Sequence, residues 1–359
     1  MARRWQEGLD LVKKSKAGAT TEVMGGSGGL VSVMYSEDLG FQQIKRVPGK
    51  GYGQVFPPQI QMNFTDFLPM FEEQERRLQA LALANNQTKQ TLKEYVCLNF
   101  LPIFNKKAGG YSPFGRNIID DLPPNPLSRF IDASEHDTVN VWAQGRERLA
   151  ALHHDASNNI LGVLSGTKTV HLIDPSKHDE GVYAGYFPDF EYARDGEGKY
   201  SLGDNTGHNI WHRSPVNDVL RPDLDRLPKF REVMEQNDLI RCDMEPGDGL
   251  FIPEPWWHEV RNAVPEGSFG DDGTQGANVA INYWWDSNPM MKRLSESLKR
   301  ARVMDWVMHG EELDEEFERV ARRNRAATRR REDEEDDSGD EDSGDDDDSG
   351  DEDSGDEED

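Results

Sequence analysis

Short segments with strand-forming residues dominate the chain between residues 139 and 285. Each spans four to eight residues, and turn-forming pairs such as Ser165-Gly166 separate them. Short runs of this kind, bounded by turn residues, are typical of β-strands. It predicts strands at residues 139–142, 151–155, 160–164, 169–173, 239–244, 249–252, 258–262 and 278–285. Many short strands joined by tight turns favour a sandwich or barrel such as a jelly roll.

The N-terminal flank has a mixed pattern. Strands are predicted at residues 30–35 and 95–100, and apolar positions at helical spacing predict a helix over residues 66–84. A short amphipathic segment occupies residues 5–14. Residues 175–236 form a polar insert, which we expect to be irregular and to lie on a rim of the barrel.

Helical patterns follow the last strand. Ser287 can cap a helix with Pro289 in its first turn, and a second, charged helix is predicted over residues 311–331. The apolar stripe of these helices could close the barrel or pair two subunits as a homodimer. We therefore expect a mainly β protein with flanking helices, divided into a mixed N-terminal part (1–130), a β core (131–286), a helical segment (287–331) and an acidic tail (332–359).

Charge is concentrated at the C-terminus. The formal net charge is -27, yet residues 332–359 contain 20 acidic and no basic side chains, so the preceding 331 residues carry only -7. The tail has no apolar residue to bury and repeats Ser-Gly-Asp, which predicts disorder. Such a tail would repel nucleic acid and attract basic proteins.

Cysteine usage and hydropathy exclude several classes of protein. The only cysteines are Cys97 and Cys242, too few for a disulfide framework or a cysteine-rich zinc site. No apolar run approaches the roughly 20 residues that span a bilayer. We expect an intracellular protein without a membrane anchor, in the cytoplasm, the nucleus or both. Any bound metal must be held by imidazole and carboxylate.

The strongest chemical signal is the stretch Leu152-His153-His154-Asp155. On a strand, His153 and Asp155 would share one face and could chelate a divalent ion. His258, 105 residues after His153, is the best third ligand. Two histidines and one carboxylate leave a face of the metal open, as in non-haem Fe(II) oxygenases. Taken alone, a His-x-Asp pair also fits a hydrogen-bonded surface histidine.

A lysine suggests what would bind beside the metal. Lys168 lies after the Ser165-Gly166 turn, where it can point into the barrel. A lysine facing an apolar interior is costly unless it meets an anion. Asn159 and Asn282 can share this interior. Together these groups suit 2-oxoglutarate, a dicarboxylate that chelates iron at one end and pairs with an ammonium group at the other.

These motifs resemble the JmjC (jumonji C, cupin-like) oxygenases, most closely the small JmjC-only hydroxylases. The matching stretches are residues 139–142, 152–155, 159, 165–168, 246–248, 257–258 and 280–284. The resemblance implies a double-stranded β-helix in which His153, Asp155 and His258 hold Fe(II). It also implies that Lys168 and Tyr95 bind the distal carboxylate of 2-oxoglutarate, and that Asn159, Asn282 and Trp284 line its pocket.

The chain departs from these relatives at one position of the pocket. Ala150 stands three residues before His153, where relatives place Thr or Ser to hydrogen-bond the co-substrate. Losing one hydrogen bond to a charged group costs about 1.5 to 3 kcal/mol. Relatives also precede the first residues with a longer segment, which leaves the completeness of the N-terminus open.

The resemblance implies a dioxygenase that uses O2 and 2-oxoglutarate, forms succinate and CO2, and hydroxylates a protein side chain. Its nearest relatives favour a lysyl residue on a GTP-binding or other basic protein. Two alternatives stay open. One is a JmjC histone demethylase, and the other is a non-catalytic cupin scaffold whose acidic tail binds basic proteins.

Overall fold

The described part of this computed structural model covers most of the predicted β core. It comprises residues 30–37, 43–47, 51–83, 92–98, 100–112, 115–116, 137–145, 148–182, 189–207, 213–225, 227–263, 278–285, 293 and 297. The chain divides into two units, residues 1–311 and residues 312–359, and all described residues belong to the first unit. The amphipathic segment at residues 5–14, the acidic tail and the C-terminal helices lie outside the described residues, except that Arg293 and Ser297 are helical.

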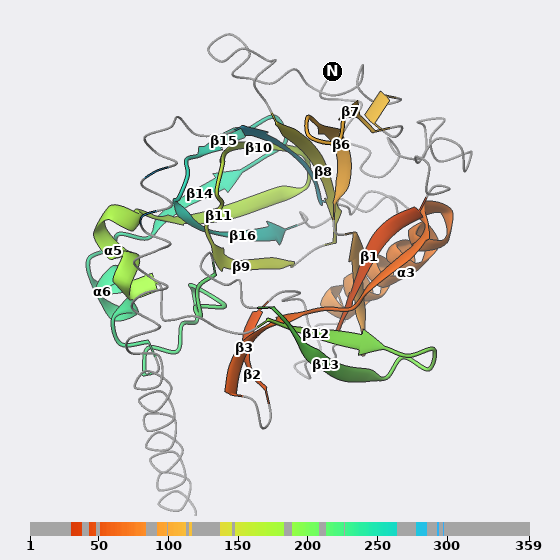
Figure 1. The fold of residues 1–359 in the computed structure, drawn as a ribbon, viewed down its shortest axis with the longest axis horizontal. Coiled ribbons are helices and arrows are strands. Elements are labelled where there is room, and N and C mark those ends of the chain that lie inside the picture. Colours follow the sequence, from red (N-terminus) through yellow and green to blue (C-terminus); the bar gives the residue numbers. More distant parts are fainter. Residues whose placement is uncertain are drawn as a thin grey trace, which may run out of the picture. The chain divides into compact units, whose positions relative to one another are not determined.

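The described residues form 17 strands and three helices (Figure 1). The helices are α3 (Phe64–Leu83), α5 (Pro175–Val182) and α6 (Phe230–Glu235). The strands before the core are β1 (Leu30–Ser36), β2 (Gln43–Val47), β3 (Gly51–Phe56), β4 (Gln59–Asn63), β5 (Tyr95–Leu98), β6 (Leu101–Asn105) and β7 (Gly110–Tyr111). The expectation of a mainly β protein with few helices is confirmed.

Eight strands make up the core, and they divide between two sheets. They are β8 (Thr138–Gln144), β9 (Leu149–His153), β10 (Asn158–Ser165), β11 (Thr167–Ile173), β14 (Ile240–Met244), β15 (Gly249–Ile252), β16 (Trp257–Ala263) and β17 (Asn278–Trp285). One sheet has the order β15-β10-β17-β8-β6-β7, and the other has the order β14-β11-β16-β9. All pairs in both sheets are antiparallel.

Apolar side chains from the two core sheets pack against each other. Leu161 and Val163 of β10 share a buried cluster with Val170 and Leu172 of β11, and Ala280 of β17 belongs to the same cluster. Because side chains alternate between the faces of a strand, every second residue of each strand reaches this interior. The two sheets therefore face each other.

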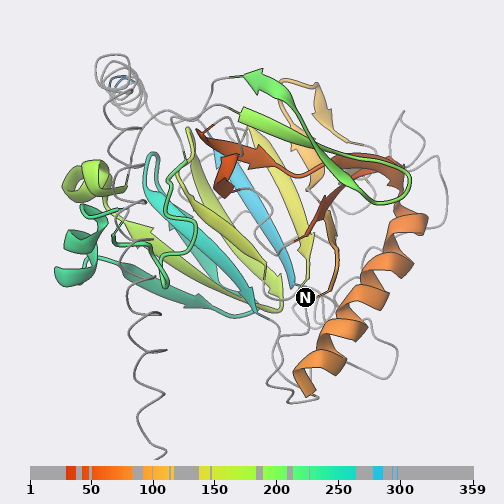
Figure 2. The same ribbon diagram turned by 90° about the horizontal axis from the view of Figure 1, so that it is seen from below.

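The N-terminal part covers the outer side of the six-stranded sheet. Strands β4, β1 and β5 form a sheet of their own, against which α3 packs. Phe67 and Phe71, four residues apart on α3, are fully buried in a cluster that also contains Val141 and Ile281 of the core. Figure 2 shows α3 on the side of the molecule opposite α5 and α6.

The prediction that the insert at residues 175–236 is irregular is wrong. It contains α5 and α6 and two strands, β12 (Asp189–Arg194) and β13 (Tyr200–Gly207). These strands join β2 and β3 in a separate sheet with the order β13-β12-β3-β2. These strands contain many charged and small residues. Phe190 is the only buried apolar residue of β12, where it packs against Val47 of β2 and Val55 of β3. A strand with so few buried apolar residues gives little signal in the sequence.

Strand boundaries in the core lie close to the predicted ones. The strand at residues 278–285 matches β17 at both ends, whereas β9 ends at His153 rather than at Asp155. The domain boundaries and the double-stranded β-helix stay predictions. Within the described ranges, no helix is both long and apolar enough to cross a membrane.

The turn between β10 and β11 gives a test of the packing. Gly166 has φ +71°, and a Cβ there would lie 2.7 Å from Nδ2 and 3.0 Å from Cα of Asn278. Gly109 has φ +93° with nothing within 4 Å. We expect Gly109→Ala to lower the free energy of unfolding by about 1 kcal/mol through backbone strain, and Gly166→Ala by about 2 to 3 kcal/mol. Urea unfolding measures both; equal losses would contradict the close packing at Gly166.

Candidate active site

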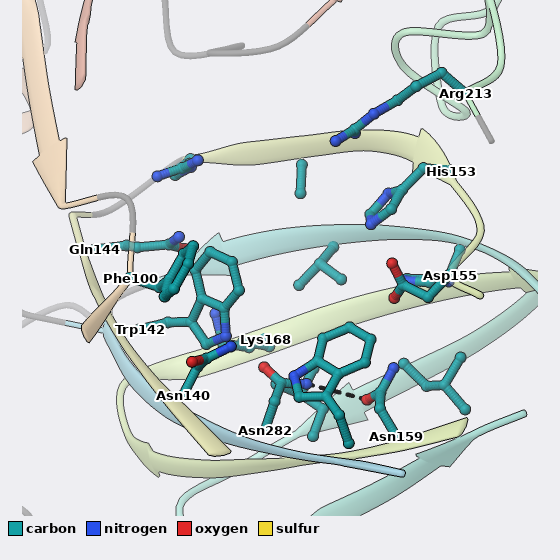
Figure 3. A pocket seen from close by; sticks show the side chains of 17 residues that line it. Phe100, Asn140, Trp142, Gln144, His153, Asp155, Asn159, Lys168, Arg213 and Asn282 are labelled. Atoms are coloured by element: carbon teal, nitrogen blue, oxygen red, sulfur yellow. Dashed lines mark hydrogen bonds and ion pairs between the residues drawn. The ribbon is translucent and has the colours of Figure 1, made fainter. Parts of the chain in front are cut away.

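A cavity of about 350 Å³ opens between the two core sheets. Its walls combine apolar and aromatic side chains with a large number of polar ones, so it is more polar than the usual small-molecule site and suits a charged ligand. The polar and charged lining residues are Asn140, Gln144, Arg148, His153, Asp155, Asn159, Lys168, Arg213, His258 and Asn282 (Figure 3).

His153, Asp155 and His258 meet at one end of this cavity. One ligand atom from each lies within 4.8 Å of the others. His153 ends β9 and pairs directly with His258 at the start of β16, and the two rings are 4.3 Å apart between centroids. The sequence argument placed Asp155 on the same strand face, but the chain has left the strand there. The carboxylate reaches the histidines from the following turn, with Oδ2 3.3 Å from Nε2 of His258.

Hydrogen bonds to the backbone fix both imidazole rings. Nδ1 of His153 lies 2.8 Å from the carbonyl oxygen of Ala151, and Nδ1 of His258 lies 3.0 Å from that of Trp256. A carbonyl oxygen can only accept, so each Nδ1 must carry the proton. The Nε2 lone pairs are then available to a metal. This orientation of a ligand by its other ring nitrogen is typical of metal-binding histidines.

The protonation states also suit a cation. Burial, together with the charges of His258 and Arg213, lowers the pKa of His153 well below its ordinary value, so the ring is neutral at neutral pH. Burial raises the pKa of Asp155, but the neighbouring His258, His153 and Arg213 lower it by more, so the net pKa is lowered and the carboxyl group is ionised. A neutral imidazole and an ionised carboxylate are the forms that bind metal.

These three residues fit a divalent metal with open coordination positions. Two nitrogens and one oxygen are too few for a structural zinc site, which takes four protein ligands. Two histidines and a carboxylate are typical of non-haem Fe(II) oxygenases. The donor set therefore fits Fe(II).

Lys168 lies at the far end of the cavity from Asp155 (Figure 3). It is 3% exposed, and its ammonium group donates to Oδ1 of Asn262 at 2.5 Å. No carboxylate within the described ranges lies within 4.0 Å of that ammonium group. Burial and the nearby Arg148 lower the pKa of Lys168 to about 7. A buried cation with only an amide as partner is ready for an anion.

Other polar groups of the cavity also lack partners. The indole nitrogens of Trp142 and Trp284 and Oδ1 of Asn140 are buried without a hydrogen bond to the described residues. Asn282, by contrast, donates to Oδ1 of Asn159 at 3.0 Å. Buried polar groups are normally paired, so this wall fits a polar ligand better than an apolar one. A dicarboxylate between the three candidate metal ligands and Lys168 would satisfy that requirement.

The structure does not bring Tyr95 to the cavity. Its strand, β5, pairs with β1 in the N-terminal sheet, and its ring packs with Met34 and Cys97 in a separate cluster. A sheet outside the core holds this strand, so Tyr95 is not among the residues that line the cavity, and its contact with 2-oxoglutarate stays a prediction. Ala150, in contrast, lines the cavity. The hydroxyl group that relatives have at this position is therefore absent from the cavity wall itself.

The sequence prediction missed lining residues and also the hydrogen-bond partner of Lys168. Arg148 and Arg213 add two cations to the cavity, and Asn262 supplies the partner of Lys168. Arg213 lies in the insert, where no motif marks it. Asn262 could have been found, since it lies four residues after His258 and thus on the same face of β16.

Comparison with known protein families shows which family the chain belongs to. A family profile described as "Cupin-like domain" matches residues 12–291, more than three quarters of the chain. The chain belongs to the cupin-like domain family. The family expected from the sequence is thus confirmed.

Relatives of this cupin-like protein include JmjC proteins. The human "Bifunctional peptidase and (3S)-lysyl hydroxylase JMJD7" is 29% identical over 173 residues, which cover 47% of this chain and 49% of that protein. The Arabidopsis thaliana "Lysine-specific demethylase JMJ31" is 30% identical over 161 residues, 45% of this chain and 23% of that protein. "Lysine-specific demethylase JMJ32" of the same plant is 26% identical over 156 residues, 42% of each chain. The match spans half or less of each relative.

The metal-binding role of the three residues can be tested directly. We expect Asp155→Asn to lower the affinity for Co(II), a spectroscopic substitute for Fe(II), by about 100-fold or more, because the amide provides no charge. Visible absorption measures the titration. Asp243→Asn, which changes an exposed carboxylate of β14, is the matched control and should bind as the wild type does. Equal affinity in the two variants would place the metal elsewhere.

Lys168 predicts a pH dependence for binding of a dicarboxylate. Only the ammonium form attracts the anion, and the pKa of about 7 means that this form is lost as the pH rises above neutrality. At saturating Mn(II), affinity for 2-oxoglutarate should fall between pH 7 and 9 with proton uptake on binding, which calorimetry in two buffers measures. Lys168→Arg keeps its charge and should remove the pH dependence. An unchanged slope in that variant would exclude Lys168 as its source.

Proposed function

We propose that this cupin-like protein is an Fe(II)- and 2-oxoglutarate-dependent dioxygenase that oxidises a protein side chain. One observation carries the proposal: His153, Asp155 and His258 converge at one end of a cavity whose other end holds the buried ammonium group of Lys168. The relatives named as hydroxylase and demethylases support the same general reaction.

The iron, when bound, would supply the O2-dependent oxidation of a C–H bond, coupled to conversion of 2-oxoglutarate to succinate and CO2. His153 and His258 would hold it through Nε2, and Asp155 would hold it through a carboxylate oxygen. The backbone carbonyls of Ala151 and Trp256 keep both rings in the ligating tautomer.

Lys168 would orient the co-substrate by pairing with its distal carboxylate. The ion pair would give the buried ammonium group the anion that Asn262 cannot supply. The unpaired indole N–H groups of Trp142 and Trp284 are further donors toward a carboxylate in this cavity. They are therefore candidates to replace the hydroxyl donor that is absent at Ala150.

Aromatic side chains would exclude water from the reacting groups. Phe100 packs on Trp142 with ring centroids 5.6 Å apart, and both line the cavity, as does Trp284. A dry site strengthens electrostatic interactions and prevents side reactions.

The strand order also supports the finer fold assignment, a double-stranded β-helix. Strands β8, β10, β15 and β17 lie in one core sheet, and β9, β11, β14 and β16 lie in the other. The chain thus passes back and forth between two facing sheets, as a jelly roll requires. The cavity lies between them, where both sheets contribute polar residues.

Hydroxylation is the preferred outcome of the reaction, with a lysyl residue as the target that the name of the human relative suggests. Demethylation is a second candidate, because two relatives carry that name. A protein substrate in the cytoplasm or nucleus, attracted by the acidic tail if it is basic, remains the expected partner.

Co-product formation tests the proposal. The full chain is loaded anaerobically with Fe(II), mixed with 2-oxoglutarate and a peptide panel, and exposed to O2. We expect succinate that rises with a substrate peptide and disappears in Asp155→Ala. Formaldehyde released with the succinate would indicate demethylation instead. Folded protein that shows no Fe(II)-dependent binding of 2-oxoglutarate would contradict the proposal and favour the scaffold.

A further inference from the structure

Arg213 brings a positive charge to the metal-binding end of the cavity. Its backbone forms an antiparallel bridge with His153, and the next residue continues the contact, since the Ser214 N–H donates to the carbonyl oxygen of Leu152 at 3.0 Å. The side chain of Arg213 lines the cavity (Figure 3). This residue therefore extends the edge of β9 beside the metal-binding residues.

Polar contacts fix the segment that carries Arg213. The side chain of Asn217 bonds both the N–H and the carbonyl oxygen of Ile44 in β2, at 3.0 and 2.7 Å. Val219 donates its N–H to Oε2 of Glu259 at 2.8 Å. Such bonds to two different sheets hold the backbone of the segment in place, so Arg213 is presented in a defined position.

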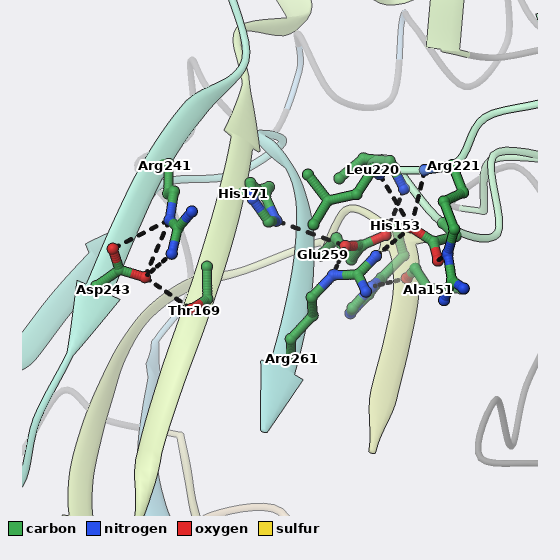
Figure 4. Close-up of polar contacts among 12 residues, drawn as sticks. Ala151, His153, Thr169, His171, Leu220, Arg221, Arg241, Asp243, Glu259 and Arg261 are labelled. Carbon is green, nitrogen blue, oxygen red and sulfur yellow. Dashed lines mark hydrogen bonds and ion pairs between the residues drawn. The ribbon is translucent and has the colours of Figure 1, made fainter. Parts of the chain in front are cut away.

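Glu259, the β16 residue that accepts the hydrogen bond from Val219, is itself buried and makes further polar contacts. Glu259 is 0% exposed, its Oε1 accepts from Nε of Arg261 at 2.8 Å, and His171 lies 3.5 Å away (Figure 4). Arg261 in turn pairs with Asp218 of the same segment. Glu259 directly follows His258, so the strand that provides a candidate metal ligand also positions Arg213.

The charges around Arg213 leave the cavity positive. Arg148, Lys168 and Arg213 line it against one carboxylate, Asp155. A divalent metal and a dianionic co-substrate would cancel each other, which leaves two positive charges among the lining residues. Asp189, which also attracts Arg213, offsets one of them. Burial lowers the pKa of Arg213 to about 10, so it stays protonated at neutral pH.

We infer that Arg213 selects an acidic side chain on the substrate, at or beside the residue that is oxidised. The inference rests on the proposed function. A planar guanidinium group binds a carboxylate through two parallel hydrogen bonds, which gives geometric selectivity as well as attraction. A lysyl target would meet repulsion from this cation, and an acidic neighbour on the same peptide would offset it.

Selection from a random peptide library tests the inference. The full chain is loaded with Mn(II) and 2-oxoglutarate, which bind without turnover, and the retained peptides are sequenced. The wild type should enrich Asp and Glu at one position by about tenfold or more, the effect of one charged hydrogen bond. Arg213→Gln should lose this preference, and Arg213→Lys should keep part of it. Arg241→Gln, at an exposed arginine of β14 outside the cavity, should retain it in full.

Each other outcome overturns the inference. These outcomes are enrichment of Lys or Arg, no enrichment by the wild type, or equal acidic enrichment by wild type and Arg213→Gln. Retention of Mn(II) and 2-oxoglutarate is measured on the same samples. If the folded wild type retains neither, the proposed function itself fails; if it retains both but shows no acidic preference, only the role of Arg213 fails.

Discussion

The pairing of β16 with its two neighbours sets the positions of His153, His258 and Lys168 relative to one another. On one side His258 lies opposite His153 of β9, and on the other Asn262 lies opposite Lys168 of β11. His258 and Asn262 share a face of the strand, four residues or about 13 Å apart. One register thus places the two histidines at one end of the cavity and the ammonium group at the other. A shift by one residue would turn both ends away from the cavity.

The opposite face of the same strand supports the site from outside. Glu259 and Arg261 alternate with the cavity residues and hold the segment that carries Arg213. The chain as a whole is strongly acidic, with a formal charge of -27, yet three cations line the cavity. Net charge therefore says little about the site. The local charges, which favour an anion, follow from strand pairing.

The sequence predicts the core well where a short segment is rich in β-branched and aromatic residues, as in β17, which is buried along nearly its whole length. It also identifies His153, His258 and Lys168, which lie on or directly beside strands that the sequence predicts. It fails where tertiary contacts decide. Asp155 reaches the metal-binding end from a turn, and Tyr95 is held in another sheet. No local pattern marks Arg213, because its place in the cavity depends on bonds to residues far away in the chain.

The most direct test of this account is a crystal structure of the full chain with Mn(II) and 2-oxoglutarate bound in the absence of O2. The account predicts one metal ion bonded to His153, Asp155 and His258, and one dicarboxylate whose distal end pairs with Lys168. A metal bound elsewhere would contradict it. So would a co-substrate that leaves the ammonium group of Lys168 with Asn262 alone.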